Sequence, residues 1–385
     1  MKKNQLYQNQ IIKGKLSLLL LAILFIVSCK KEAQPPTDAD MNLERAQTLQ
    51  AVSPNILVNA GSSIQAAVDA ANPGDIIQVK PGTYKEAVVV NKAGIKLVGL
   101  SNGPNGVIIE NPGDKENGIT VQDNGDGFEL YNVTVQNFEE NGVILTHVNN
   151  FVLSHVTTIK NGEYGLFPLF CNGGKIDHCS ATGHTDTGIY VGQSTNVDMS
   201  YNEAFGNVNG LEIENCSHVT ATNNQSYDNV DGMLVVLLPG LTVTSSSDIT
   251  VSRNHMYNNN HANFSTPGGG FENLVPSGCG ILIVGTDNTT VQDNTVQANN
   301  FLGIAVVSTT VLGALAGIPP EAFAGIEPNP DGTKVKDNVV NSNGTVQPAL
   351  PFPAVDLLWD GSGTNNCWSS NNFKKSYPQT LPACN

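Results

Sequence analysis

The sequence predicts an all-β solenoid in which each repeat of the chain forms one coil of three short strands. The first observation is a glycine followed by an aliphatic residue, which recurs every 22 to 24 residues apart from one double interval of 48. This column contains Gly118, Gly142, Gly165, Gly188, Gly210, Gly232, Gly280 and Gly303. The second observation is the composition. With 14% charged residues, 38 glycines and 20 prolines, a coiled coil is excluded, and a 40% hydrophobic fraction excludes wholesale disorder.

Short runs of alternating apolar residues, such as Val197 and Met199, supply the strands and put one side of each strand into a common core. A column of turn residues follows these runs: Asn132, His155, His178, Asn202, Asn224, Asn254, Asn294 and Asn338. We expect it to form a hydrogen-bonded ladder from coil to coil, with His155 and His178 as turn residues rather than catalytic groups. A leucine-rich repeat has a similar period, but its leucine pattern and helical connectors are absent.

Residues 1–28 have the pattern of an export signal. Four lysines precede an apolar run over residues 16–27, which is too short to span a bilayer. The run ends in Ile26-Val27-Ser28-Cys29, which resembles the lipobox of bacterial lipoproteins. An ordinary signal peptide with an incidental cysteine is the alternative. The resemblance implies a lipid on Cys29, a flexible tether over residues 29–54, and the outer membrane as destination, because residue 30 is Lys and not Asp.

The charge balance limits the partners. From Cys29 onward the chain has 15 basic and 34 acidic residues, a net charge of −19, since four of its 19 basic residues come before Cys29. Such a chain repels nucleic acid and anionic lipid headgroups, so we expect membrane contact only through the lipid. An anionic polysaccharide would need a bridging cation. We expect a monomer.

The repeats begin behind a short helix that we expect to cap the stack. Ser62 or Ser63 is its N-cap, and its apolar face consists of Ile64, Ala67, Val68 and Ala71. A strand over Ile76–Val79 and a turn over Pro81–Tyr84 follow. Together with the glycine column, this ordered run resembles the right-handed parallel β-helix superfamily of pectate lyases, polygalacturonases and mannuronan epimerases.

The resemblance is closest to an exported bacterial family of parallel β-helix repeat proteins, and it covers residues 55–385. It implies a right-handed, single-stranded parallel β-helix over residues 55–346, with residues 347–385 as a C-terminal cap or tail. In that Pro- and Asn-rich tail, Cys367 and Cys384 are predicted to form a disulfide that stabilises the fold by about 3 kcal/mol. The cysteines inside the repeats have no CxxC spacing and are predicted to be buried small hydrophobes: Cys171, Cys179, Cys216 and Cys279.

The strand after each repeat glycine has two outward-facing columns. The first column consists of the residues two positions after glycine: Thr120, Ile144, Phe167, Tyr190, Glu212, Leu234, Leu282 and Ala305. The second column consists of the residues four positions after glycine, such as Glu214 and Val236. In the later coils both columns are apolar, so the outer face of this sheet must be covered there. We predict that two long loops, residues 258–279 and 309–333, lie over the sheet and wall a cleft.

The middle coils are expected to stay uncovered and to form a polysaccharide-binding cleft. Aromatic rings stack on sugar faces, and paired carboxylates bind hydroxyls or move protons. The candidate catalytic residues are Glu212, Glu214, Tyr190 and Asp186. The candidate substrate-binding residues are Phe167, Phe170, Gln193, His184 and Asp231. The alternative is that the two glutamates are solvated and have no role.

The catalytic signatures of the resembled enzymes are incomplete. The segment from Tyr164 to Phe170 resembles the mannuronan epimerase segment Tyr-Gly-Phe-Asp-Pro-His-Asp, but Phe167, Leu169 and Phe170 stand where that segment has Asp, His and Asp. Epimerisation by that mechanism is therefore excluded. The basic residues of a pectate lyase and the Asp-Asp pair of a polygalacturonase have no clear counterparts here.

The sequence therefore predicts a cell-envelope lipoprotein that binds a polysaccharide and, in one alternative, cleaves or modifies it as a lyase or hydrolase. The other alternative is a non-catalytic scaffold that acts with a second exported protein, as the resembled family implies. Calcium is the one cofactor considered. Asp123 and Asp126 offer it closely spaced oxygens, although such a run also forms a plain turn.

Overall fold

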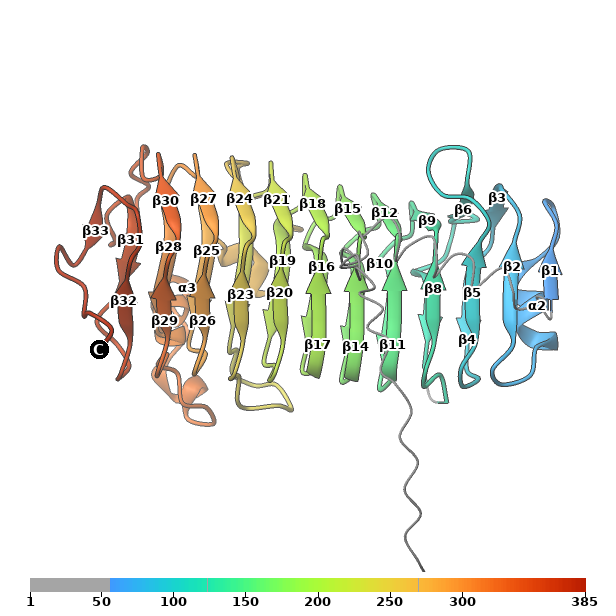
Figure 1. Cartoon of the computed structure of the whole chain (residues 1–385), viewed down its shortest axis with the longest axis horizontal. Helices are drawn as coiled ribbons and strands as arrows, with labels where there is room; N and C mark the ends of the chain where they lie inside the picture. Colours follow the sequence, from blue (N-terminus) through green and yellow to red (C-terminus); the bar gives the residue numbers. More distant parts are fainter. Residues whose placement is uncertain (1–55, 123, 269) are drawn as a thin grey trace, which may run out of the picture. The chain divides into compact units, whose positions relative to one another are not determined.

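The computed structural model describes residues 56–122, 124–268 and 270–385, so the export signal, Cys29, the tether and Asp123 lie outside the described residues. The described chain winds into successive coils that stack from the blue to the red end (Figure 1). Equivalent strands of successive coils pair in parallel, as β16 (Thr187–Gly192) does with β19 (Asn209–Glu214). The predicted all-β stack of coils is confirmed.

The stack contains three parallel sheets, one for each strand of a coil. The 12-stranded sheet consists, in stacking order, of β1 (Ile56–Val58), β2 (Ile76–Val79), β5 (Lys96–Gly99), β8 (Glu129–Tyr131), β11 (Asn149–Ser154), β14 (Asn172–Asp177), β17 (Thr195–Ser200), β20 (Thr220–Thr222), β23 (Thr250–Ser252), β26 (Thr290–Gln292), β29 (Lys334–Lys336) and β32 (Cys367–Ser369). The 10-stranded sheet consists of β3 (Gly82–Lys85), β6 (Val107–Glu110), β9 (Val133–Gln136), β12 (Thr157–Ile159), β15 (Ser180–Thr182), β18 (Glu203–Phe205), β21 (Gln225–Tyr227), β24 (His255–Tyr257), β27 (Thr295–Gln297) and β30 (Val339–Asn341).

The third sheet carries the repeat glycines and is called the glycine sheet below. Its 11 strands are β4 (Val88–Val90), β7 (Asn117–Val121), β10 (Asn141–Thr146), β13 (Tyr164–Leu169), β16, β19, β22 (Asp231–Val236), β25 (Cys279–Val284), β28 (Leu302–Val307), β31 (Val355–Trp359) and β33 (Ser376–Tyr377).

The residues one and three positions after each repeat glycine form the interior of the stack, as the alternation predicts. Leu211 and Ile213 of β19 are fully buried, and Leu211 pairs with Met233 of the next coil. The glycine itself is required by close contact. A Cβ on Gly210 would lie 2.0 Å from Ser226 Oγ and 2.7 Å from the carbonyl oxygen of Gly232, so any side chain there would push two coils apart.

Two asparagine ladders run along the turns inside the stack. In each, the backbone N–H and the side-chain Nδ2 of one asparagine donate to the Oδ1 of the next asparagine. The first ladder contains Asn202, Asn224, Asn254, Asn294 and Asn338. The second contains Asn207, Asn229, Asn259, Asn299 and Asn343.

The predicted ladder column is wrong by one residue over its first three members. Asn132, His155 and His178 have left-handed backbones with φ near 55°, and their equivalent in the next coil is Tyr201, which directly precedes the ladder residue Asn202. The rings of His155 and His178 stack with centroids 4.9 Å apart. These histidines are turn residues, as the sequence predicts.

A helix packs against the first strands of the stack. The helix α2 (Ile64–Ala70) begins at Ser63, whose side chain accepts a hydrogen bond from the Ala66 N–H, and it buries Ile64, Ala67 and Val68. The expected turn over Pro81–Tyr84 is instead mostly strand β3. At the other end, the stack extends past the expected boundary at residue 346, because β31, β32 and β33 of the predicted cap or tail pair in parallel with the sheets. Cys367 of β32 and Cys384 form the predicted disulfide. The four repeat cysteines are buried and free.

The outer face of the glycine sheet is covered over its later coils, as predicted. The first long loop carries the short helix η1 (Phe271–Leu274), and the second carries α3 (Thr309–Ala316) and η2 (Pro320–Phe323). Figure 1 shows these insertions against the C-terminal half of the stack. Two further segments, residues 237–247 and 348–354, also contribute. A second apolar core forms beneath the covers and includes Leu234, Leu238, Val275, Leu282, Phe301 and Leu358.

Candidate functional site

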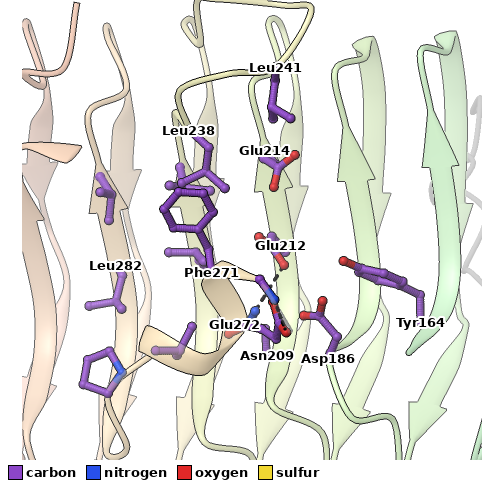
Figure 2. Close-up of a pocket in the computed structure, with 16 residues that line it drawn as sticks. Tyr164, Asp186, Asn209, Glu212, Glu214, Leu238, Leu241, Phe271, Glu272 and Leu282 are labelled. Atoms are coloured by element: carbon purple, nitrogen blue, oxygen red, sulfur yellow. Dashed lines mark hydrogen bonds between the residues drawn. The ribbon is translucent and has the colours of Figure 1, made fainter. Parts of the chain in front are cut away.

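A cavity of about 210 Å³ lies on the outer face of the glycine sheet, where the middle coils meet the covered ones (Figure 2). Its polar wall consists of Tyr164, Asp186, Asn209, Glu212, Glu214 and Glu272. Its apolar wall consists of Leu234, Val236, Leu238, Leu241, Phe271, Val275, Leu282 and Val284. The two walls meet between adjacent strands, because Glu212 and Glu214 of β19 pair with Leu234 and Val236 of β22.

Glu212 is the most deeply placed acid of the polar wall, with 5% of its surface exposed. Its Oε2 accepts a hydrogen bond from Asn209 Nδ2 at 3.1 Å and another from the Thr187 hydroxyl. Burial raises the pKa of Glu212 well above its usual value, and the nearby carboxyls of Asp186 and Glu214 raise it further. Its surroundings therefore favour the neutral, protonated form of the Glu212 carboxyl.

Asp186 lies on the turn that leads into β16 and is 9% exposed. Its Oδ1 is 3.1 Å from the same Thr187 hydroxyl that contacts Glu212. Burial raises the pKa of Asp186 to about 7, although hydrogen bonds from Tyr164 and Thr187 act in the opposite direction. Asp186 and Glu212 thus form a pair of buried acids that contact one hydroxyl, and burial raises the pKa of both.

Glu214 is half-buried and is held by Tyr190, whose hydroxyl donates a 2.7 Å hydrogen bond to Glu214 Oε1. Burial raises the pKa of Glu214, while this hydrogen bond lowers it. The Tyr190 ring lies over Gly192, where a Cβ would be 1.9 Å from the tyrosine oxygen. Gly192 therefore makes room for Tyr190. We refer to Asp186, Glu212 and Glu214 as the carboxyl cluster.

An aromatic wall borders the carboxyl cluster on the side of the earlier coils. The ring of Phe167 is stacked on Tyr164 at a centroid distance of 4.4 Å and lies 4.7 Å from Tyr190. Phe170 lies apart from this wall and stacks on His147 at 4.9 Å. Neither Phe167 nor Phe170 is among the residues that line the cavity.

The expectation that the middle coils are uncovered is wrong for Tyr190 and Glu212, because both are buried. The covering segments reach further along the stack than the loop boundaries suggest. Gln193 illustrates this, since its Oε1 accepts a hydrogen bond from the Val243 N–H of the segment 237–247. Its side chain therefore holds a cover segment in place.

His184 and Asp231 do not border a cleft, in contrast to the expectation. His184 is fully buried and takes the place of an asparagine in the second ladder: its backbone N–H donates to Asn207 Oδ1, and its ring contacts Thr158 and Asn161. Asp231 is also fully buried, beside Asn209 of the preceding coil, and among the described residues no side chain donates a hydrogen bond to its carboxyl oxygens. The physical reasons differ. His184 lies within the ladder between two coils, whereas Asp231 pairs with Cys279, which belongs to the second apolar core beneath the covers.

Three residues of the site were not predicted from sequence. Thr187 and Asn209 directly precede repeat glycines, and strict alternation would turn this column inward. Their side chains instead meet Glu212, as the hydrogen bond from Asn209 shows. The run of polar residues in this column was the signal that could have found them. Glu272 comes from the loop over the cavity, where its Oε1 accepts hydrogen bonds from the Gly270 N–H and Asn273 Nδ2, and no periodicity marks it.

Acidic groups elsewhere in the described residues offer alternatives for a cation. Of the proposed calcium pair, Asp123 lies outside the described residues, and Asp126 Oδ1 accepts hydrogen bonds from the backbone and side chain of Asn149. The oxygens of Asp287, Glu327 and Asp331 lie within 4.8 Å of one another, away from the cavity. Asp287 Oδ1 already accepts a hydrogen bond from the Asp331 N–H.

The three parallel sheets, each made of equivalent strands from successive coils, define this chain as a parallel β-helix protein. It belongs to the family described as right handed beta helix region, whose model matches residues 117–374. The A-module of mannuronan C-5 epimerase AlgE4 from Azotobacter vinelandii has a similar structure, with a TM-score of 0.58 and 16% identity over 83% of this chain and 98% of that one. The AlgE6 A-module of the same organism gives a TM-score of 0.59 and 15% identity over 81% and 92%.

A third similar structure is DFA-IIIase from Arthrobacter chlorophenolicus A6, without its lid and in complex with GF2. Its TM-score is 0.53 and its identity 15%, over 84% of this chain and 99% of that one. At such identities the likeness shows a common fold alone. The comparison with curated protein sequences finds no match.

Proposed function

We propose that this chain is a carbohydrate-active hydrolase that cleaves a neutral glycoside at the carboxyl cluster. The observation that carries the proposal is the contact of Asp186 and Glu212 with one hydroxyl, Thr187 Oγ1, at the base of a covered cavity. Two oxygens that both contact one atom are at most about 6 Å apart, which is compatible with the spacing of carboxyls in retaining glycosidases and shorter than that in most inverting ones.

The surroundings of the two acids assign the roles. Glu212 is the more deeply buried acid and has carboxyls on both sides, which favours its protonated form, so Glu212 is the proton donor to the glycosidic oxygen. Asp186, with a pKa of about 7, supplies the carboxylate that attacks the anomeric carbon. Water then hydrolyses the resulting glycosyl ester, and the Glu212 carboxylate takes the proton of that water. Glu214 and Tyr190 orient the sugar hydroxyls.

A neutral substrate fits the charge of the site. None of the residues that line the cavity is basic, and four of them are acids: Asp186, Glu212, Glu214 and Glu272. A uronate would meet this acidic wall without a positive charge to pair with it, so its desolvation would not be compensated. This argues against a lyase that acts on a polyuronate, although two proteins of similar fold are mannuronan epimerases by name.

The test uses the purified chain and a panel of neutral oligosaccharides, with products followed by reducing-end release and mass spectrometry. We expect Glu212→Gln to lower kcat by about 10²- to 10⁴-fold with little change in KM. The matched control is Glu203→Gln on β18, where Tyr227 donates a 2.8 Å hydrogen bond to Glu203 outside the cavity. Sugar binding without turnover by the unchanged chain would favour the non-catalytic alternative, a scaffold that works with a second exported protein.

We also propose that the chain is a lipoprotein of the cell envelope, facing the compartment in which extracellular glycans are met. The support is the sequence Ile26-Val27-Ser28-Cys29 behind a basic and apolar leader. No helix among the described residues has the length and apolarity needed to cross a membrane. In a Gram-negative host, Cys29→Ala should move the protein from the membrane fraction to the soluble fraction. Retention of the variant in the outer membrane would contradict lipid anchoring.

A further inference from the structure

The cavity has two chemically different ends, and the carboxyl cluster lies between them. Figure 2 shows the carboxyl groups of Asp186, Glu212 and Glu272 close together, with Tyr164 on one side and Phe271, Leu238 and Leu282 on the other. A substrate that is uniformly covered with hydroxyls would match only one of these ends.

The apolar end follows from the register of the glycine sheet. The column that holds Glu212 continues as Leu234 and then Leu282 in the next two coils, and the column of Glu214 continues as Val236 and Val284. Adjacent coils are about 4.8 Å apart. The lining therefore changes from carboxyl to hydrocarbon within one coil, and the covering residues Leu238 and Phe271 complete an apolar chamber over β22 and β25.

The polar end opens into a second hollow. This hollow shares Tyr164, Asp186, Gly270 and Glu272 with the cavity and adds Glu163, Thr185 and Thr266. Its lining offers hydroxyls and carboxyls, which suit sugar hydroxyls. Asp186 lines both spaces, so it stands at their junction.

A sugar ring in the apolar chamber would lose its hydrogen bonds to water and gain none, at a cost of up to a few kcal/mol for each buried hydroxyl. A hydrocarbon group has no such penalty. A dry, apolar cavity of about 150 Å³ in another protein takes up benzene. The apolar chamber is only part of a cavity of about 210 Å³, so its occupant is limited to about one aromatic ring.

We infer that the substrate is a glycoside whose aglycone is a single aromatic ring, with this ring in the apolar chamber and the sugar over the polar hollow. The inference rests on the proposed hydrolase for the position of the bond that is cleaved. In the reaction, Glu212 protonates the glycosidic oxygen, the bond between that oxygen and the anomeric carbon breaks, and the phenol leaves. Water supplies the hydroxyl group of the released sugar. One glycoside and one water thus give one sugar and one phenol.

The first experiment tests the chamber without any sugar, using toluene as the probe and NMR or calorimetry as the readout. The unchanged chain should bind toluene, and Leu282→Phe, which fills the chamber, should weaken binding at least tenfold. Leu358→Phe is the control, because Leu358 occupies the same column two coils further on, is buried, and does not line the cavity. If Leu282→Phe does not fold, Val236→Thr, which keeps the shape of Val236 but adds a hydroxyl, replaces it with the same expectation. Failure of the unchanged chain to bind toluene would overturn the inference.

The second experiment compares phenyl and methyl glycosides of the same set of neutral sugars. Phenyl glycosides should have at least a tenfold higher kcat/KM, and toluene should compete with them. Equal values for phenyl and methyl glycosides would overturn the aglycone assignment while leaving the hydrolase intact. Conversely, Glu212→Gln should still bind toluene. Unchanged turnover by that variant, with toluene binding intact, would overturn the proposed hydrolase and leave the apolar site standing.

Discussion

The asparagine ladders and the carboxyl cluster both bring polar side chains of successive coils together, but they differ in the hydrogen bonds that these side chains make. Asn259 Oδ1 accepts hydrogen bonds from the backbone and side chain of Asn229, and its Nδ2 donates to Asn299 Oδ1 and to the Ser226 carbonyl. Glu212 has two donors beside it, together with two further carboxyls that disfavour its charge. The ladder repeats the same hydrogen bonds at every step, whereas the cluster brings carboxyl groups together that raise one another's pKa.

The difference follows from the chemistry of the two groups. An amide carries donors and an acceptor, so it can repeat indefinitely along a stack. A carboxylate only accepts, so stacking carboxylates beneath a cover raises their pKa values until some are protonated. A solenoid therefore gains stability where its buried polar residues repeat as amides. Where acids replace them, it gains groups that can transfer protons, at some cost in stability.

Breaking a ladder should give the largest effect on stability. Asn259→Ala leaves partners of the lost amide on Asn229, Ser226 and Asn299 unsatisfied inside the stack. Because each unsatisfied buried group costs about 1–3 kcal/mol, we expect a loss of at least about 3 kcal/mol in the free energy of unfolding, measured with urea. Thr220→Ala, which removes an exposed hydrogen bond to Asp198 between coils, should cost less than about 1 kcal/mol. Similar losses in both variants would contradict the role of the ladder.

The pH dependence of turnover tests the other side of the comparison. Asp186 has a pKa of about 7 and acts as a carboxylate, so kcat/KM should rise as the pH increases through about 7. Asp186→Asn should remove this limb and lower kcat/KM by at least about 100-fold. Asp287→Asn is the control, because burial also raises the pKa of Asp287, which lies outside the cavity. A profile that falls through pH 7 in the unchanged chain would reverse the roles of Asp186 and Glu212.

Asp231 links the two regions, since it is a buried acid that directly follows the amide of Asn209 in the same column of the glycine sheet. Burial raises its pKa well above the usual value, and the Gly232 N–H offsets only part of this rise. The folded state therefore binds the proton more tightly than the unfolded state, so stability is greatest below the unfolded pKa of about 3.9 and falls as the pH increases.

Asp231→Asn should remove this dependence, because the amide has no proton to lose and adds a donor near the unpartnered Asn209 Oδ1. We expect it to raise the unfolding free energy by about 1–3 kcal/mol at pH 7 and by much less at pH 4. Unfolding in urea at the two pH values measures both. A gain of the same size at pH 4 and pH 7 would show that titration of Asp231 is not the cause.

The fold could be predicted from sequence because it depends on a repeated contact. Each repeat glycine, such as Gly210, is required by the neighbouring coil, so its spacing appears directly in the sequence. The need for covers was likewise visible in the outward Leu234 and Leu282. The candidate site was only partly predictable, because Glu272 comes from a loop without periodicity and Asn209 turns outward against the alternation. The extent of the covers, which buries Glu212, depends on contacts such as that of Gln193 with Val243.

The smallest expected effect compares two equivalent tyrosine–glutamate pairs. Tyr190 donates to Glu214 inside the cavity at 2.7 Å, and Tyr227 donates to Glu203 on β18 at 2.8 Å. Tyr190→Phe and Tyr227→Phe each remove one hydrogen bond, so each should cost about 0.5–1.5 kcal/mol of unfolding free energy.

Only Tyr190→Phe also raises the pKa of Glu214, because it removes the hydroxyl whose hydrogen bond lowers that pKa. It should therefore reduce kcat/KM at neutral pH by about three- to tenfold, which corresponds to about 0.6–1.4 kcal/mol. Tyr227→Phe should leave kcat/KM unchanged, and equal activities of the two variants would place Glu214 outside the reaction.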